Sequence, residues 1–316
     1  MRISAVVRCL NEIEHIERLV FGLRAQSLPI DELIFVDSGS TDGTLELIED
    51  LGDIVVHIDR SEFSFGRSLN RGISQASGDL VLICSAHVYP SHDDWVEQMA
   101  RMFDNGRIAY VYGRQIGDHR TKFSELRVMK SWFPPVSTAA QSHPFANNAN
   151  AMLRRSVWCE RGFDEYLTGL EDIEWARYVQ GIGFELAYCA TAPVFHVHEE
   201  NWSTIRNRYR REAMAYKKMF PGAEMAAVQA MRLACSSVIL DLLASLKSRT
   251  AVSPLEVVQF RMNQFYGTWK GYASGMPDAE LISRLYYPRR TGVEADSMNG
   301  RALSYDGFSA SEEALG

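Results

Sequence analysis

The chain has 316 residues, of which 46% are hydrophobic and 23% are charged. This length suffices for a full hydrophobic core and predicts one large domain with additions, or two domains. The formal net charge is −7, which excludes the overall positive field typical of nucleic-acid-binding proteins.

The five cysteines are odd in number and form no CxxC pair. This usage argues against a disulfide framework or a zinc knuckle, and it predicts buried, reduced thiols in a cytoplasmic protein. The first apolar stretch, ISAVV, is too short for a signal peptide. Because the chain contains no run of 18 uncharged apolar residues, we expect no membrane span.

The first third of the chain alternates predicted strands with predicted helices, joined by short loops. A helix is expected to open at Asn11 and Glu12, with Asn11 at the N-cap. Strands are expected at Ile3–Cys9, Glu32–Val36, Ile54–Ile58, Leu80–Cys84 and Ile108–Tyr112, and further helices at Leu45–Leu51, Ser64–Gln75 and His92–Phe103. Such alternation predicts an α/β fold with a doubly wound, mostly parallel sheet flanked by helices.

The rest of the chain changes character twice. After a less regular region to about Pro144, the pattern indicates a strand and helix in AMLRRSVW, a helix in EDIEWARYVQ and a strand at Phe184–Ala190. Beyond Asn201 it becomes all-helical, with a basic helix, an amphipathic helix at Ala226–Leu246 and a helix from Leu255. From about Tyr287 the composition predicts a loose tail.

Polar residues cluster where two predicted strands end. The apolar run Leu80–Cys84 breaks into Ser85, Ala86 and His87, and the second strand ends in VDSGSTDGT at 36–44. Ligands of open α/β sheets bind beyond the carboxyl ends of the strands, so this edge is a candidate binding site. The alternative is a strand end with an ordinary surface histidine.

Six stretches in this order resemble the family 2 glycosyltransferases, which have the GT-A fold, over about residues 1–215. They are VVRCLNE (6–12), VDSGSTDGT (36–44), GRSLNRGISQASGDLVL (66–82), YGRQ (112–115), FANNANAMLRRSVW (145–158) and GFDEYLTGLEDIEW (162–175). YGRQ, FANNANAMLRR and EDIEWARY look most like bacterial rhamnosyltransferase-type members that build surface polysaccharide. The resemblance implies a catalytic domain at 1–215, with a nucleotide-sugar half at about 1–115 and an acceptor half at 116–215. It leaves a C-terminal helical extension at 216–286 and a tail at 287–316.

The resemblance also assigns roles. The catalytic base is Asp172, with Glu171 as the alternative, although both acids could merely favour a helix N-terminus. A carboxylate beside a second carboxylate should have a raised pKa, which suits a base. The predicted nucleotide and phosphate contacts are Asn11, Glu12, Asp37, Ser38, Arg67, Asn70, Ser85 and Ala86. Weaker candidates are Arg114, Arg154 and Arg155 for phosphate, and Asn148 and Asn150 for the acceptor side. For Arg67 and Asn70 the alternative is a solvated helix face.

The sequence departs from the family where an Asp-x-Asp-like motif usually binds the ribose and a divalent cation. The matching triplet is Ser85, Ala86 and His87, without a carboxylate. We favour a manganese or magnesium ion held by His87 and His196, with His198 as a substitute, because imidazole is a competent ligand for such ions. The alternatives are a metal-independent enzyme whose arginines balance the diphosphate, and a histidine pair that only caps a strand end.

The predicted function is that of an inverting glycosyltransferase. It would move a sugar from a nucleoside-diphosphate donor to a glycan or lipid-linked glycan acceptor in one displacement. The alternatives are a nucleotide-sugar binding protein without turnover and, less favoured, a nucleotidyltransferase. Six basic residues and one acid lie between Ile205 and Lys218. This basic helix and Ala226–Leu246 suit peripheral contact with the inner membrane face. Packing on the catalytic domain or in a homodimer is the alternative, and no nucleic-acid partner is expected.

Overall fold

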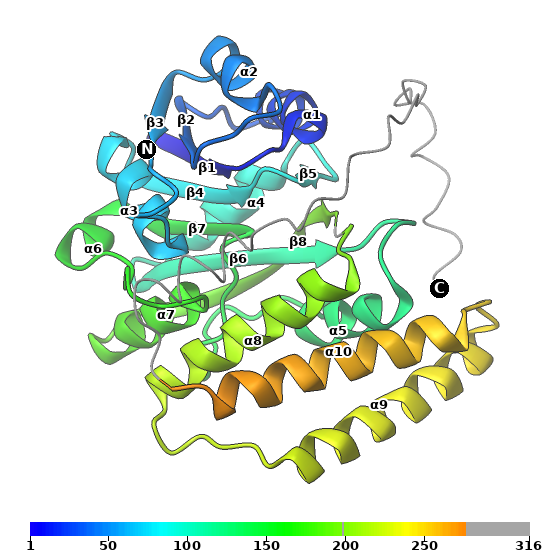
Figure 1. Ribbon diagram of the computed structural model, residues 1–316. Coiled ribbons are helices and arrows are strands. Elements are labelled where there is room, and N and C mark those ends of the chain that lie inside the picture. The colour runs from blue at the N-terminus through cyan, green and yellow to red at the C-terminus, as the bar shows by residue number, and fades with distance from the viewer. Residues whose placement is uncertain (198, 276–316) are drawn as a thin grey trace.

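The computed structural model describes residues 1–197 and 199–275, and these fold around one mixed sheet (Figure 1). The eight strands of the described chain are ordered β3-β2-β1-β4-β7-β6-β8-β5. Their bounds are β1 Ile3–Cys9, β2 Glu32–Asp37, β3 Ile54–His57, β4 Leu80–Ser85, β5 Val88–Pro90, β6 Ile108–Ile116, β7 Asn150–Arg154 and β8 Glu185–His196.

Helices cover both faces of this sheet. Successive residues of β1 point to opposite faces, and Ala5 and Val7 belong to one buried cluster while Val6 belongs to the other. Both faces are therefore buried, which explains why the strands are almost continuously apolar. The helices are α1 Ile13–Arg24, α2 Thr44–Leu51, α3 Phe65–Gln75, α4 Trp95–Arg101, α5 Phe123–Trp132, α6 Arg155–Glu160, α7 Glu171–Gly181, α8 Trp202–Met219, α9 Ala227–Ser248 and α10 Pro254–Ala273, with a 3₁₀ turn at Met102–Asp104.

The sheet is parallel on one side and mixed on the other. β1 pairs in parallel with β2 and β4, β2 with β3, and β6 with β8. β7 runs antiparallel between β4 and β6, and β5 runs antiparallel to β8. Because Cys84 of β4 pairs with Asn150 of β7, the chain that precedes β7 meets the carboxyl end of β4. This arrangement confirms the predicted α/β sheet.

Several predicted elements differ from those observed. The turn expected after His87 contains the short strand β5, and the less regular region contains α5. Asn11 is not the N-cap: α1 starts at Ile13, and Asn11 has a φ of 56°. Its Oδ1 instead accepts the N–H of Thr41 at 2.8 Å. The expectation of five buried thiols was also wrong, because Cys159 and Cys235 are exposed.

The last three helices form a layer of their own. α10 packs against both α8 and α9, and the three run side by side along the lower edge of Figure 1. α8 crosses the boundary predicted at residue 215, and the predicted tail at 287–316 lies outside the described residues. Within the described chain, one helix, α9, is long enough and apolar enough to cross a membrane. Its most apolar 18-residue stretch has a mean hydropathy of 1.5, and 17% of that stretch is buried. Length and composition alone support this possibility.

Candidate functional site

Two adjoining cavities lie where the sheet edge meets the C-terminal helices. The first has a volume of about 940 Å³ and the second about 450 Å³. Both are lined by Arg8, Phe65, Ser85, His87 and Arg211. The predicted site residues that line the first are Glu12, Ser38, Ser85, Ala86 and His87, and those that line the second are Ser85, His87, Asn148, Glu171, Asp172 and His196.

The loop after β2 is organised by the carboxylate of Asp37. Asp37 is 2% exposed and accepts the backbone N–H of Gly39 at 2.8 Å and of Ser40 at 3.2 Å. Gly39 has a φ of 89°, which favours glycine, so the chain can turn back over Asp37. Ser38 donates its hydroxyl to the carbonyl of Cys9 at 3.0 Å. These bonds hold Ser38 at the rim of the first cavity.

A row of polar side chains leads from the first cavity to the second. The Nδ1 of His87 lies 2.9 Å from the Oε1 of Glu12, and the Nδ1 of His196 lies 2.6 Å from the Oε1 of Gln115. The two rings stack, with centroids 5.1 Å apart and planes inclined by 20°. Burial lowers the pKa of His87, but the carboxylate of Glu12 outweighs it and the pKa is raised overall.

The first turn of α7 brings two acids into the second cavity. The Asp172 carboxylate accepts the N–H of Asn148 at 3.2 Å and of Ile173 at 2.8 Å. The Oε1 of Glu171 lies 3.9 Å from the Nη1 of Arg8. Burial, and then the charge of Glu171, raise the pKa of Asp172 to about 8. A carboxyl group with a pKa near neutral can take a proton from a hydroxyl at working pH.

Comparisons with known proteins show the family to which the chain belongs. The family model described as glycosyl transferase family 2 matches residues 4–160. The chain belongs to glycosyl transferase family 2. Its relatives include the O-antigen chain rhamnosyltransferase RfbN of Salmonella typhimurium, 28% identical over 67% of this chain and 70% of that protein. The O-antigen chain rhamnosyltransferase WbaN of Salmonella anatum is 27% identical over 57% of this chain and 60% of that one. The expected rhamnosyltransferase-like family 2 glycosyltransferase is thereby confirmed.

Solved structures of glycosyltransferases confirm the GT-A fold. The mannosyltransferase PcManGT from Pyrobaculum calidifontis, in complex with GDP-Man and Mn²⁺, has a TM-score of 0.57 at 16% identity. The comparison covers 84% of each chain. S. aureus TarS 1-349 in complex with UDP has a TM-score of 0.52 at 16% identity, covering 85% of this chain and 90% of that chain.

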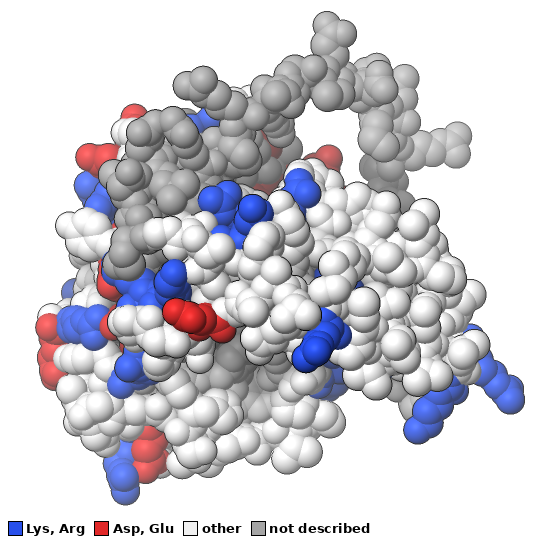
Figure 2. Space-filling model, turned by 60° about the horizontal axis from the view of Figure 1, so that its bottom comes forward, with Lys and Arg blue, Asp and Glu red and all other residues white. Residues whose placement is uncertain are grey.

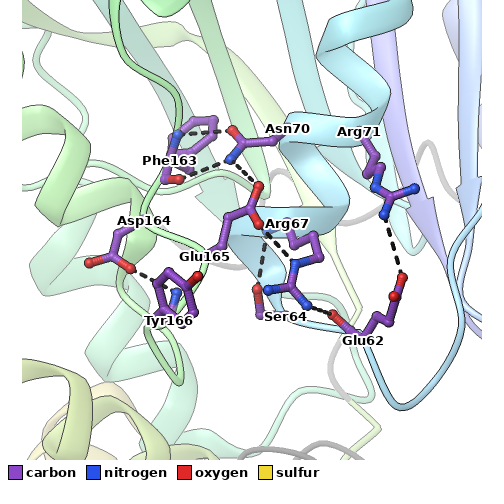
Figure 3. A network of polar contacts seen from close by, with 9 residues as sticks. All are labelled: Glu62, Ser64, Arg67, Asn70, Arg71, Phe163, Asp164, Glu165 and Tyr166. Carbon is purple, nitrogen blue, oxygen red and sulfur yellow. Dashed lines mark hydrogen bonds and ion pairs between the residues drawn. The ribbon is translucent and has the colours of Figure 1, made fainter. Parts of the chain in front are cut away.

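Arg67 and Asn70, predicted to reach phosphate, contact a loop of this family 2 enzyme instead. Neither lines the two cavities. Figure 3 shows that both point from α3 toward the segment before α7, where the Nε of Arg67 lies 2.8 Å from Glu165. The side-chain amide of Asn70 accepts the N–H of Phe163 at 2.9 Å and donates to its carbonyl at 2.9 Å. These contacts favour a positioning role, and phosphate binding by either residue stays a prediction.

Among the weaker candidates, Asn148 lines the second cavity, while Arg154 and Asn150 are held by structural bonds. Arg154 donates to the carbonyls of Ile108 and Phe103, at the edge of the sheet opposite to the cavities. The buried amide of Asn150 bonds Trp95 and the carbonyl of Ala192. Neither Arg154 nor Asn150 lines either of the two cavities, and the same is true of Arg114 and Arg155.

The geometry does not fit a metal ion held between His87 and His196. In two stacked rings the nitrogen lone pairs lie in nearly parallel planes, so both cannot point at one ion. Within residues 1–197 and 199–275, no group of three His, Cys, Asp or Glu side chains is arranged to hold a metal. His198 lies outside the described residues. A divalent-cation cofactor therefore stays a prediction for this chain.

The cationic wall of the first cavity was not predicted from the sequence. Arg206, Arg210 and Arg211 of α8 and Lys270 of α10 line it together. From the sequence, the basic helix is predicted to contact the inner membrane face. Its i, i+4 pair at 206 and 210 indicated one shared face, but the sequence did not show that this face turns toward the sheet edge.

Proposed function

We propose that this glycosyltransferase is an inverting enzyme that uses Asp172 as its general base. The first cavity takes the nucleoside-diphosphate sugar, and the second takes the acceptor. The observation that carries the proposal is that Asp172, with a pKa of about 8, lines a cavity that shares Ser85 and His87 with the first. A sugar at the junction would have the base on one side and the diphosphate on the other.

The reaction is a single displacement at the anomeric carbon. An acceptor hydroxyl beside Asp172 gives its proton to the carboxylate as its oxygen attacks the anomeric carbon. The bond from that carbon to the diphosphate oxygen breaks, and the nucleoside diphosphate leaves with the electron pair. The configuration is inverted because attack and departure occur on opposite faces of the sugar.

The second cavity suits a carbohydrate acceptor. Its wall contains the aromatic side chains of Trp132 and Phe133, and Trp132 is 40% exposed. Aromatic faces next to carboxylates match the apolar and hydroxyl-bearing faces of a sugar ring. The names of RfbN and WbaN support a glycan of bacterial surface polysaccharide, free or lipid-linked, as the acceptor.

A lipid-linked acceptor would bring the enzyme to the inner membrane face, and α9 supports this location. Its outer side exposes seven large apolar residues: Val228, Met231, Leu233, Ile239, Leu240, Leu243 and Leu246. Figure 2, in which the lower side of the molecule comes forward, shows a broad surface with few charged atoms. A homodimer through the same surface is the alternative.

Turnover with a panel of nucleotide sugars tests the mechanism. We expect wild type to be active on at least one donor, and Asp172→Asn to lose about 10²-fold or more in kcat. NMR of the product at its first time points should show an inverted anomeric centre. An Asp172→Asn enzyme with near-wild-type kcat would remove Asp172 from the mechanism. Donor binding without any turnover would favour the nucleotide-sugar binding protein.

A further inference from the structure

The first cavity carries a strong excess of positive charge. Among its described lining residues, the cations are Arg8, Arg206, Arg210, Arg211 and Lys270. Glu12 is the carboxylate that faces them, and its Oε1 already lies 2.9 Å from the Nδ1 of His87. Such a cavity attracts a ligand with several negative charges.

Two glycines of α10 place the α8 cations. A Cβ on Gly267 would collide with the carbonyl oxygen of Arg206, and a Cβ on Gly271 with that of Arg210. The two helices therefore touch backbone to backbone at the two turns that carry these arginines. This contact fixes Arg206 and Arg210 on the same wall of the first cavity as Lys270, the residue of α10 that precedes Gly271.

The arginines of α8 differ in how they are engaged. The Nη2 of Arg208 forms ion pairs with Oε2 of Glu200 at 2.7 Å and with Oε1 of Glu125 at 2.5 Å. These pairs give Arg208 a structural role. The buried Nε of Arg210, in contrast, has no hydrogen-bond partner among the described residues. A buried guanidinium nitrogen without a partner is costly unless a ligand supplies an acceptor.

We propose that Arg206 and Arg210 of α8, with Lys270 of α10, bind the donor diphosphate and neutralise it in place of a divalent cation. The inference rests on the proposed function in that the diphosphate is taken to be that of the donor. Guanidinium groups offer paired N–H donors that match phosphate oxygens. Negative charge grows on the departing diphosphate during transfer, so these cations stabilise the transition state as well as the bound donor. This assignment explains why the triplet Ser85-Ala86-His87 can lack a carboxylate.

Calorimetric titration with inorganic pyrophosphate, and with UDP, GDP and dTDP, in excess EDTA tests the assignment. We expect wild type to bind pyrophosphate and at least one nucleotide in EDTA. The double variant Arg206→Gln/Arg210→Gln should bind pyrophosphate at least about tenfold more weakly, the scale of one lost charged hydrogen bond. Arg206→Lys/Arg210→Lys should recover part of the affinity. Arg232→Gln, an exposed cation of α9, is the matched control and should bind as wild type does.

Three results would overturn the assignment. The first is pyrophosphate affinity that disappears in EDTA and returns with Mn²⁺. The second is equal pyrophosphate binding by wild type and the glutamine double variant. The third is loss of pyrophosphate binding in both the lysine and the glutamine double variants while circular dichroism shows that both are folded. Asp172→Asn separates the two proposals, because it should lower kcat by about 10²-fold or more and leave pyrophosphate affinity unchanged. Full turnover by Asp172→Asn would contradict the role of Asp172 as the base and would leave the diphosphate assignment unaffected.

Discussion

Asp172 and Glu171 show how neighbouring acids tune one another. The two side chains enter the same cavity from the first turn of α7, and Asn148 contacts both of them. Burial raises the pKa of Asp172 first, and the charge of Glu171 raises it further. Glu171 thus acts on the base as well as on Arg8.

The pH dependence of kcat/KM follows from this pair. Asp172 must be deprotonated to act as a base, so activity should fall tenfold per pH unit below its pKa of about 8. Glu171→Gln removes a negative charge that favours the protonated form. We therefore expect the acid limb of the profile to move to lower pH by about one unit. A limb that stays in place or moves upward would show that another group controls it, and Glu174→Gln is the control.

Residue type predicted this chemistry better than side-chain direction did. The strand-end histidine and Ser38 could be placed at the site because a buried strand must end at the sheet edge, whereas the adjacent acids were assigned by the family resemblance. Asp37 and Asn11 are close to that edge in sequence, yet their oxygens accept backbone N–H groups of residues 39–41. Whether a carboxylate binds a ligand or its own loop depends on the turn that follows, and the strand pattern does not encode that choice.

Among the elements, α3 and the segment before α7 depend on each other. The side-chain amide of Asn70 bonds both backbone groups of Phe163 and the carboxylate of Glu165 (Figure 3). It also accepts the indole N–H of Trp158. This segment leads directly into the turn that presents Glu171 and Asp172. The network therefore connects α3 to the two carboxylates for which we propose a catalytic role.

Truncating this amide should be costly. Asn70→Ala leaves the two backbone groups of Phe163 without a partner, and we expect it to lower the free energy of unfolding by about 1–3 kcal/mol. Urea denaturation measures the change, and Gln75→Ala, an exposed position at the end of α3, is the control. An unchanged urea midpoint for Asn70→Ala would contradict the positioning role.

Elements were predictable where their pattern is local. β1 is observed over the predicted Ile3–Cys9, and the apolar run that becomes β4 is extended by one residue, Ser85. β5 has three residues and pairs with β8, more than 100 positions away, so its own sequence carries little signal. The role of α8 depends on Gly267 and Gly271, which lie in another helix. Tertiary contacts of this kind cannot be read from a helical period.

At the scale of the whole molecule, the layer formed by α8, α9 and α10 has two different surfaces, one cationic and one apolar. α8 and α10 turn cations toward the first cavity, while α9 packs on α10 and keeps an apolar outer side. The one carboxylate of α9, Asp241, is buried and paired with Arg261 at 2.7 Å and Arg127 at 2.9 Å. The exposed charges of α9 and its C-cap are therefore the cations Arg232, Lys247 and Arg249. An apolar strip bordered by cations complements an anionic lipid surface.

We expect the full chain to float with vesicles that contain phosphatidylglycerol, and to bind pure phosphatidylcholine vesicles more weakly. Replacing Ile239 and Leu243, which are 58% and 57% exposed, by aspartate should abolish flotation because it puts charge into the apolar strip. Val136→Asp, at a residue 71% exposed away from α9, is the matched control. Turnover on a water-soluble acceptor should stay unchanged in both variants, since none of the three positions lines either of the two cavities. Wild type could instead fail to float and sediment as a dimer that the two aspartate substitutions dissociate. That result would assign this surface to a second copy of the chain.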